Sequence, residues 1–186
     1  MAYAYRAAWA RSQGPVCRWR IIVGSGISLA MLQAMVFTPD RFGDFTPDLY
    51  SIMALYFALF ASRHGRYVPS LALGLIRDFL SMGLIGTYGV LYSLLHKASE
   101  KARGKLDPDR LPNILIMAVA GTFLVNFGYH AMLVVAGDGI GWSNAITRCG
   151  SIALATGPFA VFLYPLIHFA LGRVGIPRAA GGYWNI

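Results

Sequence analysis

The chain has 186 residues, of which 56% are hydrophobic and only 13% charged, and its mean hydropathy is +0.54. A soluble domain of this size needs more charge to wet its surface, so the composition excludes an ordinary soluble protein. The formal net charge is +8, but the Lys and Arg residues lie mainly between apolar runs. That distribution is typical of membrane topology and leaves no basic face for nucleic-acid phosphates. We therefore expect a protein of the lipid bilayer with no nucleic-acid partner.

Apolar runs recur along the whole chain, and each is bounded by polar or charged residues. They cover residues 19–37, 49–61, 68–80, 84–95, 114–136 and 152–171. As membrane helices, these runs predict an all-α polytopic membrane protein. Its expected parts are a cytoplasmic N-terminal segment (1–18), a six-helix membrane domain (19–171) and a cytoplasmic tail (172–186).

The distribution of positive charge decides the number of spans. With six spans and both termini in the cytoplasm, every Lys and Arg except Arg41, Arg77 and Arg148 lies on the cytoplasmic side. If residues 68–95 formed a single helix, the basic residues would be split almost evenly between the two sides. Basic residues accumulate in cytoplasmic loops. We therefore predict six transmembrane helices, with the third and fourth forming a short hairpin.

The first apolar run carries small residues at intervals of four: Gly26, Ala30 and Ala34. Such a stripe lets another helix backbone approach closely, which is how helices associate in lipid. Packing inside the protein is favoured over an external partner, and both interpretations remain open. Gln33, beside the stripe, is expected to form hydrogen bonds across helices. Further along, Thr46-Pro47-Asp48 is a start signal for the second helix.

Two charged residues, Arg77 and Asp78, interrupt the third apolar run. A charged side chain at membrane depth costs about 2.5–3.5 kcal/mol on insertion scales, so such residues are usually kept for a purpose. They precede a break with the sequence Ser81-Met82-Gly83-Leu84-Ile85-Gly86. Arg77 projects roughly 100° away from Asp78 around the helix, so the two do not pair simply. We expect the helix dipole to favour Arg77 near the C-terminal end.

Asp78 shares one helix face with Ser70 and Gly74, which lie at four-residue spacing. The returning helix has a matching small-residue face that begins at Gly86. We expect Asp78 to accept backbone N–H groups at the start of that helix, around residues 83–85. A structural cap is favoured over a ligand contact for this carboxylate, and both roles remain open.

The fifth apolar run carries a polar stripe formed by Ala118, Thr122, Asn126 and His130. In lipid these groups would lack partners, so the stripe must face protein or a cavity. We expect Asn126 to contact the hairpin near Asp78. Hydrogen bonding between helices is favoured over a pocket for a small polar ligand.

The stretch from Gly74 to Tyr88 resembles the central motif of the bacterial rod shape-determining protein MreD family. That motif has an apolar helix beginning with Gly, then an Asp, a Ser/Gly-rich break and Gly-x-Tyr. The corresponding residues in this chain are Gly74, Asp78, Ser81, Gly83, Gly86 and Tyr88. Pro47-Asp48-Leu49, the small size and the six spans are also similar, and the sequence resemblance covers about residues 47–95. Arg77 departs from the family pattern, where the position before the Asp is usually uncharged.

The resemblance implies a non-enzymatic membrane scaffold of the rod-shape complex, or elongasome, which supports peptidoglycan synthesis during elongation and maintains cell shape. It implies a place in the bacterial cytoplasmic (inner) membrane. The implied partners are the bitopic protein MreC and, through it, the actin-like MreB filament and the peptidoglycan synthases.

An alternative function is a small-molecule-binding subunit of an energy-coupling-factor-type transporter. Those subunits are also small six-helix proteins, and Ala30-x-x-x-Ala34 is similar to the small-residue motif with which they dock. Catalytic motifs such as H-E-x-x-H, G-x-S-x-G and the P-loop are absent from the sequence. The four His residues are scattered. We therefore expect no enzyme activity, no cofactor and no metal site.

The topology is tested by labelling single cysteines from outside the cell, in a background without Cys17 and Cys149. Reagents that do not cross the membrane should modify cysteines placed at 38–45 and 138–144, because these loops are predicted to face outward. Cysteines at 97–110 should remain unmodified. External labelling of the 97–110 loop would overturn the six-span hairpin.

Overall fold

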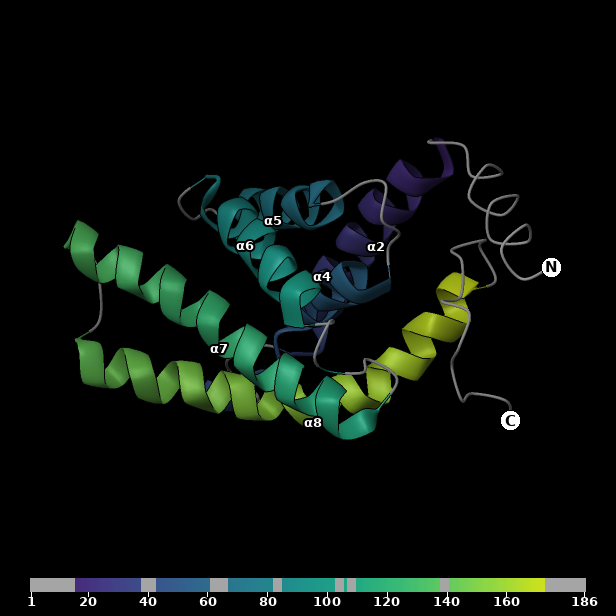
Figure 1. Ribbon diagram of the computed structural model, residues 1–186. Helices are drawn as coiled ribbons and strands as arrows, with labels where there is room; N and C mark the ends of the chain where they lie inside the picture. Colours follow the sequence, from purple (N-terminus) through teal and green to yellow (C-terminus); the bar gives the residue numbers. More distant parts are fainter. Residues whose placement is uncertain are drawn as a thin grey trace.

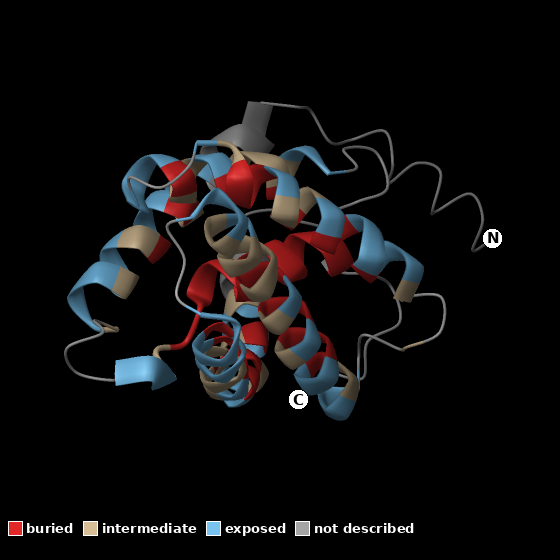
Figure 2. Cartoon of the chain, turned by 90° about the vertical axis from the view of Figure 1, so that its left-hand side faces the viewer, coloured by how far each residue is buried: buried red, intermediate tan, exposed pale blue. Residues whose placement is uncertain are grey.

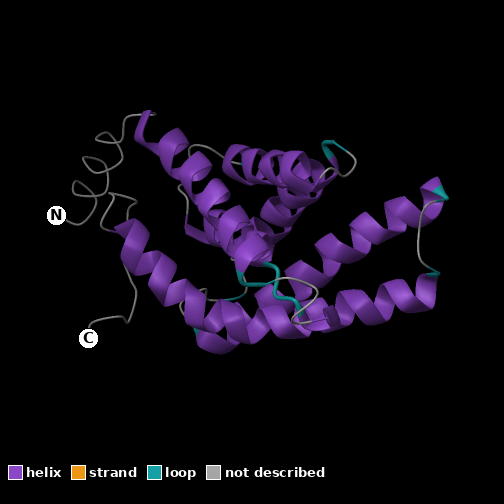
Figure 3. Ribbon diagram, turned by 180° about the vertical axis from the view of Figure 1, so that it is seen from behind, coloured by secondary structure: helices purple, strands orange, loops and turns teal. Residues whose placement is uncertain are grey.

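The computed structural model describes residues 16–37, 43–60, 67–81, 85–102, 106, 110–137 and 141–172. Within these residues the chain forms six α-helices and one short 3-10 helix, and no strand (Figure 3). In chain order they are α2 (Val16–Met35), η1 (Gly43–Phe45), α4 (Leu49–Phe60), α5 (Val68–Ser81), α6 (Thr87–Ala102), α7 (Leu111–Ala136) and α8 (Trp142–Gly172). The all-helical prediction is confirmed for the described part of the chain.

The helices are arranged as two antiparallel pairs around a central helix (Figure 1). The long helices α7 and α8 form one pair, and the short helices α5 and α6 form the other. Helix α4 lies between the pairs, and α2 packs beside α5 and α4. The C-terminal part of α8, which contains Pro158 and Pro165, turns away from the direction of α7 (Figure 1).

Helix α4 is the core of the protein. Its sequence, LYSIMALYFALF, has no charged residue and only one Ser. A helix that is apolar all round is buried all round, and residues 49–59 are all buried. Figure 2 shows these buried residues inside the bundle, with exposed residues on the outer faces of the surrounding helices.

Two glycines bring α5 and α6 into backbone contact. A Cβ atom placed on Gly74 would lie 2.5 Å from the backbone of Gly89 and 2.5 Å from the carbonyl oxygen of Tyr88. Ser70, Gly74 and Asp78 are all buried on this face, as their spacing predicted. The small-residue pattern of the hairpin therefore determines how closely its two helices approach.

Two helices, α7 and α8, are long and apolar enough to cross a bilayer, in the segments Leu111–Ala136 and Trp142–Ile167. Helix α4 has 12 residues, α5 has 14 and α6 has 16, which correspond to about 18, 21 and 24 Å against a hydrocarbon core of about 30 Å. Among the side chains that the structure describes in α2, the apolar segment is Val23–Met35. The structure therefore supports two candidate spans by length, and six spans remain a prediction.

Several helix boundaries differ from the apolar runs, because helices continue into polar sequence where it is exposed. Helix α6 begins at Thr87 and runs to Ala102, so Lys97 and Lys101 are helical and not part of a loop. Helix α8 begins at Trp142, ten residues before its apolar run. The proposed terminal segments, apart from residues 16–18 and Gly172 in helices α2 and α8, lie outside the described residues.

Replacing Gly74 by Ala should strongly destabilise the protein. The added methyl group meets backbone atoms of α6, which cannot rotate away, so we expect a loss of about 1–3 kcal/mol or more. Gly24→Ala is the matched control, because nothing lies within 4 Å of its Cβ position and Ala favours a helix by about 0.5–1 kcal/mol. Thermal unfolding in mild detergent measures both. Equal melting temperatures for the two variants would contradict the close crossing.

Candidate functional site

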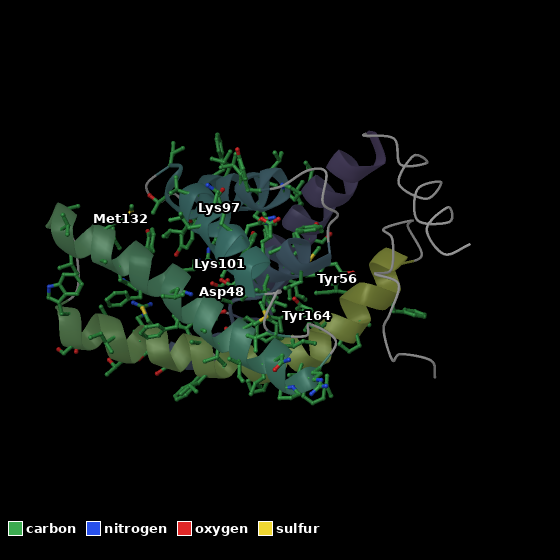
Figure 4. All side chains as sticks on the ribbon, in the orientation of Figure 1. Asp48, Tyr56, Lys97, Lys101, Met132 and Tyr164 are labelled. Atoms are coloured by element: carbon green, nitrogen blue, oxygen red, sulfur yellow. The ribbon has the colours of Figure 1, made fainter. Side chains whose placement is uncertain are left out.

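A buried carboxylate lies at the start of α4. Asp48 is 1% exposed, and Figure 4 shows it in the interior of the bundle. Its Oδ1 accepts the backbone N–H of Ser51 at 3.2 Å, and its Oδ2 accepts the Ser51 hydroxyl at 2.7 Å. This is the N-cap pattern, and it confirms the helix start indicated by Pro47-Asp48. The backbone N–H of Asp48 donates to the hydroxyl of Thr156 on α8 at 2.9 Å.

Arg77 on α5 forms an ion pair with this carboxylate. Its Nη1 donates to Asp48 Oδ1 at 2.9 Å and to Oδ2 at 2.7 Å, and also to the hydroxyl of Tyr92 on α6. The side chains of Arg77 and Asp48 are 14% and 2% exposed. As the sequence predicted, Arg77 points away from Asp78. Its partner lies on a different helix, which no local pattern in the sequence showed.

Three tyrosine rings surround the guanidinium of Arg77. Its Cζ lies 3.9 Å from the ring centroid of Tyr88, 5.5 Å from that of Tyr50 and 5.8 Å from that of Tyr92. Aromatic faces attract cations at such distances, most strongly where water is excluded. The ring of Tyr88 also stacks on Tyr129 of α7, with centroids 4.6 Å apart. The cation is therefore surrounded by one carboxylate and a cage of aromatic rings.

Asn126 on α7 also binds Asp48. Its Nδ2 donates to Asp48 Oδ2 at 3.1 Å and to the backbone carbonyl of Thr122 at 3.0 Å. The sequence placed Asn126 against the hairpin near Asp78, but its hydrogen bond goes to Asp48, the partner of the neighbouring Arg77, while Asp78 is turned towards α6. The favoured interpretation of the polar stripe, hydrogen bonding between helices, is confirmed at Asn126.

Gln33 on α2 completes the cluster. Its side-chain amide donates to the carbonyl of Pro47 at 3.3 Å and accepts the N–H of Leu49 at 3.2 Å. The hydrogen bonding across helices expected of Gln33 is therefore present. All six described α-helices supply a residue to this polar cluster at the start of α4. Its members are Gln33, Asp48, Tyr50, Ser51, Arg77, Tyr88, Tyr92, Asn126 and Thr156.

Asp78 caps the returning helix of the hairpin. Its Oδ2 accepts the N–H groups of Gly86 at 2.9 Å and Gly89 at 3.3 Å, and its Oδ1 accepts that of Tyr88 at 3.1 Å. The amides lie after the expected 83–85 region, because α6 begins only at Thr87. Gly86 has a φ of +94°, a left-handed conformation that L side chains rarely adopt. The N-terminus of α6, which is the positive end of the helix dipole, thus lies against the carboxylate of Asp78.

The remaining predicted residues have different surroundings. The hydroxyl of Ser70 lies 3.0 Å from His96 Nδ1 on α6, within the core. Ser81 is exposed, and its hydroxyl lies 3.5 Å from the carbonyl oxygen of Asp78. Gly83 lies outside the described residues. The hydroxyls of Ser70 and Ser81 therefore pair with groups other than the Arg77–Asp48 ion pair.

The stripe on α2 divides between the core and the surface. Gly26 is buried against Ile76 and Leu73 of α5, and Ala30 is half-buried. Ala34 is exposed. Internal packing therefore accounts for the first part of the stripe only, and Ala34 remains uncovered by the described residues.

Sequence reasoning missed Asp48, Tyr50 and Tyr92 as members of the site. In the antiparallel order of the helices, the start of one helix lies level with the end of the next. That rule places Asp48 and Arg77 at the same depth, and opposite charges at one depth are the signal that would have paired them. The tyrosines give no comparable signal, because aromatic residues are frequent throughout the chain.

The arrangement is suited to holding helices together. The buried carboxylates of Asp48 and Asp78 each accept several hydrogen bonds from the protein itself, so they are committed to internal contacts. Among the described residues, no three His, Cys, Asp or Glu side chains come together as a possible metal site.

The fold and the cluster define an all-helical protein of membrane type, with a polar interior that connects its helices. The family model for the rod shape-determining protein MreD matches residues 13–172, which is most of the chain. The chain therefore belongs to the MreD family. Members of this family are membrane proteins that determine rod shape; it is a family of structural proteins and not a known enzyme family. No curated protein and no solved structure matches the chain.

Breaking the ion pair should be far more costly than breaking a surface pair. We expect Asp48→Asn to lower the free energy of unfolding by about 3–5 kcal/mol, because Arg77 is left buried without its counter-charge. The control is Arg148→Ala, which removes the exposed 3.7 Å pair with Asp44 and should change stability by less than about 1 kcal/mol. Unfolding in mixed detergent micelles measures both.

The coupling between Asp48 and Arg77 is tested by the same measurement on Arg77→Met and on the double variant Asp48→Asn, Arg77→Met. The double variant should lose less stability than the two single losses combined, because neither charge is left alone. Additive losses would show that Asp48 and Arg77 stabilise the bundle independently.

Proposed function

We propose that the chain is a six-span scaffold subunit of the rod-shape complex in the bacterial inner membrane. In this proposal both termini lie in the cytoplasm. The subunit binds an MreC-like bitopic membrane protein and, through it, is connected to an MreB-like filament and to the peptidoglycan synthases. The family membership carries the proposal, and the internal geometry supports it in two ways.

The position of the polar cluster supports an antiparallel order for the first four of the six proposed spans. Gln33 is near the end of α2, Asp48 at the start of α4, Arg77 near the end of α5 and Tyr88 at the start of α6. These positions come to one level only if successive helices run in opposite directions. At the other end of the bundle, Lys97 Nζ lies 5.6 Å from the ring centroid of Tyr67, a Lys–Tyr pair of the kind favoured at a membrane surface. This end is the cytoplasmic one under the positive-inside rule.

The depth of the short helices also fits this topology. Helix α4 is enclosed by other helices, so the polar groups at its start contact protein instead of lipid. The capped turn between α5 and α6 has backbone N–H groups held by Asp78. Irregular backbone is tolerated at membrane depth when protein groups satisfy it.

The interior supports a scaffold more than a substrate-binding subunit. A binding protein for a small polar ligand needs polar groups that are free to bind it. Here Asn126, from the stripe for which a pocket was considered, binds Asp48, and Asp48 in turn binds Arg77. The outer surface, and not the interior, is therefore the part offered to partners.

The test is purification of the tagged chain from its host after mild extraction. We expect a bitopic MreC-like protein in a fixed ratio to the chain, and loss of rod shape on depletion of the chain. Mass spectrometry of the same sample detects both proteins and bound small molecules. A vitamin-like ligand in stoichiometric amount without a bitopic partner would contradict the scaffold and support the transporter subunit.

Ala34 offers a sharper variant, because it is exposed and extends the small-residue stripe of α2. Ala34→Leu should lower the recovery of the bitopic partner several-fold without changing the amount of the chain, because added bulk blocks close approach of a helix. Ala120→Leu on α7 is the control, since Ala120 is also exposed but lies on no such stripe. Equal recovery with both variants would remove α2 as the docking face and leave the scaffold to be tested by depletion.

A further inference from the structure

The guanidinium of Arg77 is surrounded in the way that a protein surrounds a bound cation. Its Nη1 contacts both oxygens of Asp48 and the hydroxyl of Tyr92. The closest ring is that of Tyr88, with 3.9 Å between Cζ and the ring centroid. Carboxylate and aromatic faces together form the cages that recognise organic cations.

The walls of this cage are held by contacts that do not involve Arg77. Asp48 is fixed by the backbone and hydroxyl of Ser51 and by Asn126. Tyr88 is fixed by its stack on Tyr129. Since these contacts would remain if the Arg77 side chain were shortened, the walls are pre-organised around the position of the cation.

We propose that the interior contains a cation-binding site for a guanidinium-type ion, which the chain fills with its own Arg77 side chain. The side chain therefore acts as a tethered ligand, delivered by α5 to a cage built by α4, α6 and α7. When the side chain is removed, a free alkylguanidinium of small size binds in its place. The inference is independent of the scaffold function, because it concerns the interior alone.

The chemistry of the cage selects guanidinium over ammonium. The Cζ of Arg77 lies 3.9 Å from the ring centroid of Tyr88, and Nη1 makes the contacts with Asp48 and Tyr92. A guanidinium is less strongly hydrated than an ammonium ion, so transfer into the buried cage costs less.

The experiment uses Arg77→Ala of the full chain, made by cell-free synthesis in lipid nanodiscs with and without methylguanidinium. The readouts are the yield of monodisperse protein and its melting temperature. We expect both to fall in the variant and to recover with the ion. At a concentration ten times its Kd, the ion should raise the melting temperature of the variant by roughly 3–6 °C. Wild-type protein should not respond, because its cage is filled.

Two controls make the test specific. Methylammonium at the same concentration should give no recovery, because an ammonium ion is more strongly hydrated and its transfer into the buried cage costs more. The double variant Arg77→Ala, Asp48→Asn should not respond to methylguanidinium, because the counter-charge is gone. An unchanged melting temperature of Arg77→Ala with methylguanidinium would overturn the proposal. Equal recovery with methylammonium, or recovery in the double variant, would also overturn it. So would the absence of folded Arg77→Ala protein both with and without methylguanidinium.

Discussion

The carboxylate of Asp48, buried at the start of α4, is the group on which the rest of the bundle depends. Apolar helices in lipid have no hydrophobic force that selects their register, so polar contacts select it. Asp48 binds Arg77 of α5 and Asn126 of α7, and its own N–H reaches Thr156 of α8. A buried charge without its partner is strongly destabilising. The ion pair therefore forms only when α4 and α5 are in place together. The hydrogen bond from Asn126 adds α7 to the same carboxylate, which favours one arrangement of the helices.

Two adjacent charged residues of α5 do different work because they point in different directions. Asp78 faces α6 and holds three backbone N–H groups at its start, so it shapes the turn between the two helices. Arg77, one residue earlier, faces the core and connects the hairpin to α4. Close contact at Gly74 then brings the paired helices together. Local turn geometry and long-range docking are thus set by neighbouring side chains.

These internal contacts fit a shape-determining family whose members are structural proteins. Because the polar groups of the interior bind one another, they fix the positions of the helices and so define the outer shape of the protein. The exposed small residue Ala34 and the apolar outer faces of α5 and α6 belong to that outer shape. Under the proposed function, the outer surface contacts lipid and partners, while the ion pair and the Asp78 cap maintain the shape that they meet.

The sequence by itself determined the all-helical class, the start of α4 at Asp48, the close face of the hairpin and the family. Each of these depends on local patterns: apolar runs, a helix-start signal, four-residue spacing of small residues and a contiguous motif. Only the tertiary structure decided that Arg77 pairs with Asp48, and that Asn126 binds the same carboxylate and not Asp78. Those contacts join residues 29 and 78 positions apart. Their geometry depends on how the helices cross, and crossing is set by the packing of all the helices at once.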